Sequence, residues 1–206
     1  MPKINPNRME LLKLRRRERM ARRGHKLLKD KLDALMKRFM AAAAEARAKR
    51  ADVEGALGQA FGLLSLARGE AGSIVMTEAL AGGRSQTDVN VDTTNLLSVR
   101  IPVFSLSETT GEVSYSLATT PAILDEAVAE FSTILKRVVE LAELEKSVQL
   151  LAWEIEKTRR RVNALDHILI PRLSESIKYI NMSLAEQERA NTTRVMKIKE
   201  MVESGR

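Results

Sequence analysis

The fold is decided by the C-terminal stretch that begins TPAILDEAVAEFSTILKRVVELAELEKSVQLLAWEIEK (Thr120–Lys157) and runs on to about Glu203. Thr120 and Pro121 predict a helix start, because a hydroxyl can cap the first turn and proline suits the first helical position. Apolar residues then recur at steps that mostly alternate between three and four, the period of a left-handed coiled coil. The stretch predicts a helix of roughly 125 Å, at about 1.5 Å per residue. Its stripe consists of Leu124, Ala127, Phe131, Ile134, Val138, Leu141, Leu144, Val148, Leu151, Ile155, Val162, Leu165 and Leu169.

The period of this stripe changes near Pro171. There the stripe takes successive four-residue steps through Leu165, Leu169, Leu173 and Ile177. A stutter of this kind is expected to unwind the coiled coil locally.

A second long helix is expected to begin at Arg8, with Asn7 as its cap. From Leu28 onward its apolar residues again alternate between steps of three and four, which predicts a partner seam for the first stripe. This seam consists of Leu28, Leu32, Leu35, Phe39, Ala42, Ala46, Val53, Leu57, Ala60, Leu64 and Ala67.

The two ends of this second helix are weaker. Before Leu28 the same phase offers Arg16, Met20 and Arg23, so this end is expected to bury little against a single partner. Further along, each interior glycine costs about 1 kcal/mol of helix stability relative to alanine, so the helix is expected to end between Arg68 and Ala81. The glycines are Gly55, Gly58, Gly62, Gly69, Gly72, Gly82 and Gly83.

Residues 82–119 differ in composition from both helices. Val, Thr, Ser and Asn dominate, and apolar residues alternate with a period of two, which is typical of strands. We expect a β-hairpin in which Leu97–Leu106 pairs with Glu112–Ala118, and Pro102 confines the first strand to an edge. An isolated hairpin is marginal in water, so it should lean on a helix or on a partner.

The expected fold class is mainly α: a long antiparallel two-helix coiled coil of N- and C-terminal helices, with a small β-hairpin head at the bend. The expected segments are an extended N-terminus over residues 1–7, a coiled-coil helix over 8–80, the head over 81–119 and the second coiled-coil helix over 120–204. This pairing brings Arg15–Arg23 near Asp166–Glu186, and the C-terminal helix slightly overshoots its partner.

The composition suits a rod better than a globular domain. Of the 206 residues, only 3% are aromatic and 30% are charged, as expected for helices that bury a narrow seam. The chain has no cysteine, which excludes disulfides and thiolate zinc sites and favours a reducing compartment. We expect no secretory signal and no membrane span, because no long apolar run is present.

No catalytic chemistry is expected. His25 and His167 each lack a second ligand three or four residues away, so a solvated or core-edge role is favoured over a metal site. The glutamates between Glu140 and Glu156 alternate with Lys and Arg, which favours a lattice of helical ion pairs. Gly82–Ser85 lacks the lysine of a phosphate-binding loop. The chain is therefore predicted to have no cofactor and no enzymatic activity of its own.

The net charge of +7 is concentrated near the N-terminus. Residues 8–31 hold 11 Lys and Arg against three Asp and Glu, a balance of +8. Such a helix could bind nucleic acid through phosphates, although it offers no aromatic residues for stacking. It could lie on anionic membrane, although it lacks an apolar interfacial face. It could also be a shaft end enclosed by protein with acidic or carbonyl-rich walls. The residues alone leave these alternatives open, together with a merely solvated face.

Both ends of the chain carry stretches that resemble one protein family. NPNRMELLKLRRRERMARRGHKLLKDKLDALMKRF (Asn5–Phe39) resembles the opening of the D subunit of V-type and A-type ATPases, which is the central rotor shaft. EKTRRRVNALDHILIPRLSESIKYI (Glu156–Ile180) is similar to the second signature of that family, and Glu188–Lys199 fits its tail. The resemblance covers somewhat under half of the chain. Asn7, where the family often has threonine, and Asp166, where glutamate is usual, are mild departures.

The resemblance implies a non-catalytic central-stalk component that transmits torque. It would link ATP turnover in a hexamer of catalytic A and non-catalytic B subunits (A3B3) to proton or sodium transport by a membrane ring. The implied partners are the A and B subunits, the F subunit and a socket formed by the C/d subunit. The chain would lie peripherally at the cytoplasmic face, with no nucleic acid and only indirect contact with the membrane. The alternative is a basic coiled-coil adaptor for nucleic acid or anionic membrane.

Candidate interface residues follow from this implied role. The hexamer-facing candidates are Arg8, Met9, Leu12, Arg16, Arg19, Arg23, Arg160, Arg161, Ile168, Pro171 and Ile180. The head candidates, expected to contact the F subunit or the membrane-side socket, are Leu97, Val99, Ile101, Val103, Val113, Tyr115 and Leu117.

Overall fold

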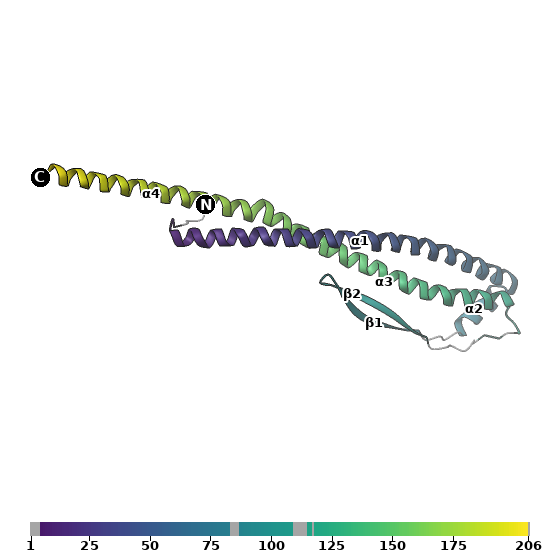
Figure 1. Cartoon of the computed structure of the whole chain (residues 1–206). Coiled ribbons are helices and arrows are strands. Elements are labelled where there is room, and N and C mark those ends of the chain that lie inside the picture. Colours follow the sequence, from purple (N-terminus) through teal and green to yellow (C-terminus); the bar gives the residue numbers. More distant parts are fainter. Residues whose placement is uncertain (1–4, 83–86, 109–114, 117, 206) are drawn as a thin grey trace. The chain divides into compact units, whose positions relative to one another are not determined.

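The computed structural model describes residues 5–82, 87–108, 115–116 and 118–205. Residues 1–33 and 156–206 form one compact unit, and residues 34–155 form a second. The expected fold class is confirmed: the chain is mainly helical, and its long N- and C-terminal helices pack together with a two-stranded antiparallel hairpin between them in the sequence. The elements in chain order (Figure 1) are α1 (Arg8–Ala71), α2 (Ser73–Gly82), β1 (Thr87–Leu96), β2 (Val99–Glu108), α3 (Ala122–Ala164), a π-helical turn (Leu165–Leu169) and α4 (Ile170–Ser204).

Helix α1 begins and ends at residues with clear backbone roles. The Oδ1 atom of Asn7 accepts a hydrogen bond of 3.3 Å from the N–H of Met9, so Asn7 is the predicted N-cap. At the other end Gly72 has a φ of +81°, a left-handed conformation that terminates helices and suits glycine. The helix expected over residues 8–80 is therefore interrupted at Gly72, and the short α2 follows.

The start of α3 differs from the expected capping pattern. The helix begins at Ala122, and the N–H of Leu124 donates to the carbonyl of Pro121 at 3.0 Å. The hydroxyl of Thr120 donates to the carbonyl of Ser116 at 2.9 Å, so it closes the preceding turn instead of capping the helix. The position of the helix start was predicted to within two residues, but the role of Thr120 was wrong.

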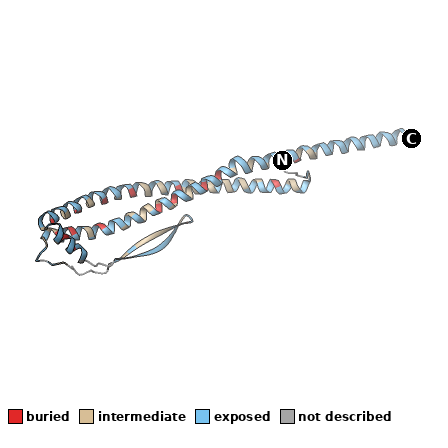
Figure 2. Ribbon diagram, turned by 180° about the vertical axis from the view of Figure 1, so that it is seen from behind, coloured by how far each residue is buried: buried red, intermediate tan, exposed pale blue. Residues whose placement is uncertain are grey.

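In the unit of residues 34–155, the facing sides of α1 and α3 form a narrow apolar seam (Figure 2). The rings of Phe61 and Phe131 meet edge to face, with their centroids 5.3 Å apart. Near the C-terminal end of α1, Met76 of α2 packs with Ala67 and Leu124 in one buried cluster. The buried residues include the predicted seam positions Leu35, Ala46, Val53, Ala60, Ala67, Leu124, Ala127, Ile134 and Leu151.

In the unit of residues 1–33 and 156–206, the seam of α1 runs in a different phase from the predicted one. Leu14 is buried, and Leu11, Glu18, Ala21 and His25 are half-buried. These positions follow steps of three and four that lead directly to Leu28. The predicted phase at this end was wrong, because polar side chains occupy two of the seam positions and hide the pattern. The expectation of little burial agrees with the structure, since Leu14 is the only buried residue among those described between Arg8 and Asp33.

The hairpin has a different register from the expected one. β1 pairs antiparallel with β2, from Thr87 opposite Glu108 to Leu96 opposite Val99. The predicted pairing of Leu97–Leu106 with Glu112–Ala118 is therefore wrong. Residues 112–114 and 117 lie outside the described residues, and 115, 116 and 118 are not in a strand.

A π-helical turn stands where the apolar stripe was expected to stutter. The N–H of Ile170 donates to the carbonyl of Leu165, one residue farther back than in an α-helix. Pro171 follows at once and has no N–H with which to continue the regular ladder. A π-helical turn holds more residues than an α-helical turn, so it accommodates the four-residue spacing of the apolar stripe here. Helix α3 therefore continues through this turn into α4 without a break.

Candidate subunit interfaces

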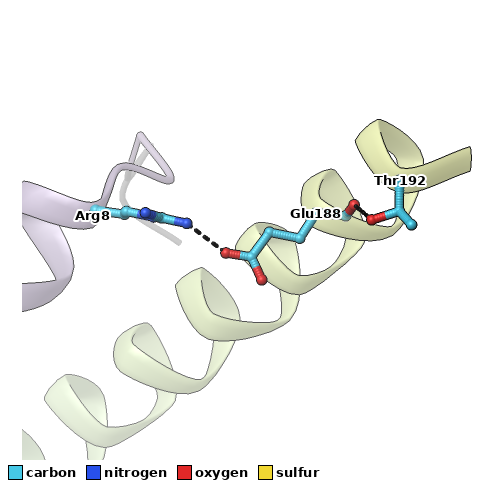
Figure 3. Close-up of polar contacts among 3 residues, drawn as sticks. All are labelled: Arg8, Glu188 and Thr192. Carbon is cyan, nitrogen blue, oxygen red and sulfur yellow. Dashed lines mark hydrogen bonds and ion pairs between the residues drawn. The ribbon is translucent and has the colours of Figure 1, made fainter. Parts of the chain in front are cut away.

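The N-terminal end of α1 is joined to α4 by polar contacts between their side chains. Arg8 Nη2 lies 2.6 Å from Glu188 Oε1, and the hydroxyl of Thr192 donates to the carbonyl of Glu188 at 2.9 Å (Figure 3). Arg15 donates to Asn181 Oδ1 at 3.3 Å. The two segments therefore run antiparallel with the expected alignment.

The outer side of α1 in this unit combines apolar and basic side chains. At about 100° per residue, Met9, Leu12, Arg16, Met20 and Arg23 lie on the side opposite the seam. All of them are exposed, with 61% of Met9 and 64% of Met20 accessible to solvent. Methionine and arginine are both enriched at protein–protein interfaces. We call these five residues the outer stripe.

The arginines of the outer stripe are not neutralised within the chain. Among the described residues, Arg16, Arg23 and the neighbouring Arg19 form no ion pair and no side-chain hydrogen bond. Arg22, by contrast, is paired with Glu18 at 2.8 Å. The predicted arginines therefore present unpaired charge on one side of the helix.

The predicted hexamer-facing residues of α3, the π-helical turn and α4 lie in different environments. Arg160 is paired with Glu156 of its own helix, and Arg161, Ile168 and Pro171 are exposed. Ile180 is fully buried, at 0% exposure. Its side chain packs within the unit, because it occupies a seam position of α4, and it offers no surface to another protein.

The C-terminal part of α4 continues past the beginning of α1. Every described residue from Ala185 onward is exposed (Figure 2). Val195, Ile198 and Val202 form an apolar stripe there that no described part of the chain covers. These three residues were not among the predicted interface positions. The sequence signal that could have identified them is the apolar spacing of three and four, which returns in a part of α4 that lies beyond the start of α1.

The predicted head residues mostly face inward. Val99 is buried with Leu35 and Leu151, and Ile101 packs against the same cluster. Val103 is half-buried in β2, whereas Leu97 is exposed in the turn before that strand. The predicted Val113 and Leu117 lie outside the described residues.

Two polar contacts hold the head against α3. The N–H of Phe104 donates to Glu143 Oε2 at 2.9 Å, so a carboxylate satisfies a backbone group at the edge of β2. The hydroxyl of Tyr115 donates to Asp125 Oδ1 at 2.5 Å. Burial and this bond to a carboxylate raise the pKa of Tyr115 to about 12.

Ion pairs also join α1 to α3 in the same unit. Lys49 Nζ lies 2.9 Å from Glu140, and Arg50 Nη2 lies 2.6 Å from Glu145. The hydrogen bonds to these glutamates raise the pKa of Lys49 and that of Arg50. Because such exposed ion pairs contribute little to stability, the apolar seam holds the helices together.

The outer side of α1 in the unit of residues 34–155 is lined by small residues. Gly55, Gly58 and Gly62 are present there, and a Cβ atom added to any of them would meet no described atom within 4 Å outside the neighbouring helix backbone. Packing among the described residues therefore does not require glycine at these positions. In the described part of the chain, no helix is long and apolar enough to cross a membrane.

Comparison with known proteins identifies the family. Residues 10–200 match the family model for the D subunit of ATP synthase. The chain belongs to the D-subunit family of V/A-type ATP synthases. The V-type ATP synthase D subunit of Thermoanaerobacter sp. (strain X514) is 46% identical over 204 residues, covering 98% of both chains. The A-type ATP synthase D subunit of Pyrococcus furiosus is 41% identical over 205 residues, covering 98% of this chain and 96% of that relative.

The match to this family extends beyond the two stretches that suggested it. The V-type ATP synthase D subunit of Clostridioides difficile (strain 630) is 46% identical over 202 residues, covering 97% of this chain and 91% of the relative. These alignments include the hairpin and the glycine-containing part of α1, for which the terminal signatures gave no support. The resemblance inferred from the sequence is confirmed.

Proposed function

We propose that this D subunit is the central-stalk shaft of a rotary ATP synthase. It transmits torque between ATP turnover in a hexamer of A and B subunits and ion transport by a membrane ring. It has no catalytic site of its own, and it acts at the cytoplasmic face with the F subunit and a C/d socket as further partners. Family membership and the paired long helices support this proposal.

The observation that carries the proposal is the outer stripe of α1. An exposed row of Met, Leu and unpaired Arg is complementary to a protein wall with apolar and acidic or carbonyl groups. The seam on the opposite side of the helix fixes the direction in which this stripe points. The hexamer-facing candidates are therefore Arg8, Met9, Leu12, Arg16, Arg19 and Arg23, with Arg160, Arg161, Ile168 and Pro171 from α3, the π-helical turn and α4.

The exposed end of α4 supports the same role. Its apolar stripe of Val195, Ile198 and Val202 needs a cover that the described residues do not supply. A surrounding collar of apolar side chains from other proteins would bury that stripe. We therefore include these residues among the hexamer-facing candidates.

A triple charge reversal tests the proposal. Arg16→Glu, Arg19→Glu and Arg23→Glu together should leave the isolated chain helical, because glutamate is as good a helix former as arginine and no described ion pair is broken. In the reconstituted synthase the reversal should prevent assembly or uncouple ATP hydrolysis from ion transport. The matched control replaces the same arginines by lysine, which keeps the charge and should keep coupling.

Two results would contradict a charge-based contact at the outer stripe, the observation that carries the proposal. Normal assembly and fully coupled turnover in the reversed variant would show that the outer stripe meets no charged wall. Loss of function in the lysine variant as well would show that the arginine shape, not the charge, is needed. Circular dichroism of each isolated variant separates both results from misfolding.

A further inference from the structure

The tip of the hairpin is built from residues that disfavour its backbone geometry. Because Leu96 pairs with Val99, Leu97 and Ser98 form a two-residue turn, with φ values of 52° and 71°. Positive φ at both positions is the mark of a type I′ turn, for which Asn-Gly is a preferred sequence. A bulky leucine in the left-handed region is an outlier, because its Cβ approaches a backbone carbonyl. The turn therefore retains a conformational cost that Asn-Gly would avoid.

Packing among the described residues does not explain this leucine. The hairpin is held on the helices through Val99, which is buried with Leu35 and Leu151. Leu97 is not part of this cluster, and 41% of its surface is exposed. Strained residues concentrate at sites that bind or switch, where another contact stabilises them. An exposed and strained leucine thus points to a contact outside the chain.

The charge beside the turn indicates the chemistry of the contact. Arg100 lies opposite Asn95, next to the closing pair of the turn. It is exposed, and within the described residues it forms no ion pair. A leucine beside an unpaired guanidinium is complementary to an apolar pocket with a carboxylate at its rim.

We propose that the hairpin tip is an anchor: Leu97 enters an apolar pocket with an acidic residue at its rim, on another protein of the synthase that turns together with this one. The anchor rests on the proposed function, because it requires assembly with other rotor subunits. The hairpin belongs to the unit of residues 34–155, whereas all the hexamer-facing candidates belong to the other unit, so we assign the pocket to a co-rotating neighbour and not to the stationary hexamer.

A matched pair of variants separates the leucine side chain from the strain of the turn. Ser98→Gly relieves strain and keeps the leucine. Leu97→Asn combined with Ser98→Gly provides the preferred type I′ sequence and differs from the first variant only at position 97, where asparagine replaces the leucine side chain. Both variants should keep the hairpin docked on α3, which protection of the Phe104 amide, bonded to Glu143, verifies by hydrogen exchange.

The variants are compared in the reconstituted synthase by the rate at which the shaft dissociates from the other rotor subunits. Ser98→Gly should dissociate no faster than the parent chain. The double variant should dissociate about tenfold faster or more, as expected for one lost buried leucine. Equal rates for the two variants would overturn the anchor.

Site-specific cross-linking in the same complex identifies the neighbour. The chain contains no cysteine, so Leu97→Cys can carry a single photoreactive maleimide. It should cross-link one other rotor protein in equal stoichiometry, whereas the control Thr93→Cys on the exposed strand β1 should not. A cross-link only to the chain itself, or to the hexamer, overturns the anchor. If one of these outcomes overturns the anchor, the shaft proposal still holds as long as ATP hydrolysis drives ion transport. The shaft proposal itself is overturned if the parent chain does not assemble into the synthase.

Discussion

Replacing glycines of α1 by alanine should stabilise this protein. Gly55, Gly58 and Gly62 lie inside a continuous helix, where glycine costs about 1 kcal/mol relative to alanine. Among the residues that the structure describes, an added Cβ would meet no atom within 4 Å at any of the three positions, apart from the neighbouring helix backbone. No packing cost therefore opposes the gain, and the triple variant should be more stable by about 3 kcal/mol.

Urea unfolding of the isolated chain, followed by circular dichroism at the helical band, measures this gain. With a slope of about 1–3 kcal/mol per molar urea, a gain of about 3 kcal/mol moves the midpoint upward by about 1–3 M. The slope itself should not change, since the surface exposed on unfolding is nearly the same.

Gly72→Ala is the matched control for this prediction. It makes the same chemical change, and its added Cβ also meets nothing within 4 Å. Its φ of +81°, however, is unfavourable for alanine by about 1–2 kcal/mol, so this variant should be less stable than the parent. An unchanged or lower midpoint for the triple variant would contradict this expected gain, because it would mean that the outer side of α1 is not free. Loss of coupling in the assembled synthase, despite the gain in the isolated chain, would instead reveal another protein close to this side.

Three further outcomes are expected. Leu35→Ala should cost about 2–5 kcal/mol of unfolding free energy, because Leu35 is fully buried beneath the hairpin; a loss below about 1 kcal/mol in urea unfolding would contradict this packing. Glu143→Ala should speed hydrogen exchange of the Phe104 amide several-fold by removing its acceptor, and unchanged exchange would mean that water or another group replaces the carboxylate. The tyrosinate absorbance of Tyr115, measured as the difference between the parent chain and Tyr115→Phe, should titrate with a midpoint at about pH 12. Asp125→Asn should lower this midpoint, because it removes the carboxylate that raises the pKa. Since the folded pKa lies above the ordinary value of 10.0, the stability contributed by Tyr115 should fall as the pH rises from 10.0 to about 12; a midpoint near 10.0 would contradict the bond to Asp125.

Local patterns predicted most of the secondary structure. The cap at Asn7, the long apolar stripes and the irregularity near Pro171 all depend on residues close together in the sequence. Strand alternation likewise predicted a hairpin in the right region. Its register was missed because Leu97 and Ser98 carry none of the usual signals of a type I′ turn.

The candidate interfaces were predicted less completely than the helices. The arginines near the N-terminus were recognised from charge alone, and the structure places Arg16, Arg19 and Arg23 on an exposed side, without partners among the described residues. The sequence could not distinguish the buried Ile180 from the exposed interface candidates, because an apolar residue on a helical stripe can face either a partner helix or another protein. Only its contacts within the folded unit decide that it is buried.

Two long pairing helices with a hairpin between them could be predicted from the sequence alone, because periodicity and capping are local properties of the chain. The buried side of α1 before Leu28, by contrast, follows only from the folded structure. At the N-terminal end of α1, the half-buried Glu18 and His25 interrupt the apolar pattern, so the true phase emerges only when α4 lies against them. The same holds for the hairpin, whose orientation is fixed by burial of Val99 between residues far away in the sequence. Long-range contacts of this kind depend on the whole fold, and no local pattern encodes them.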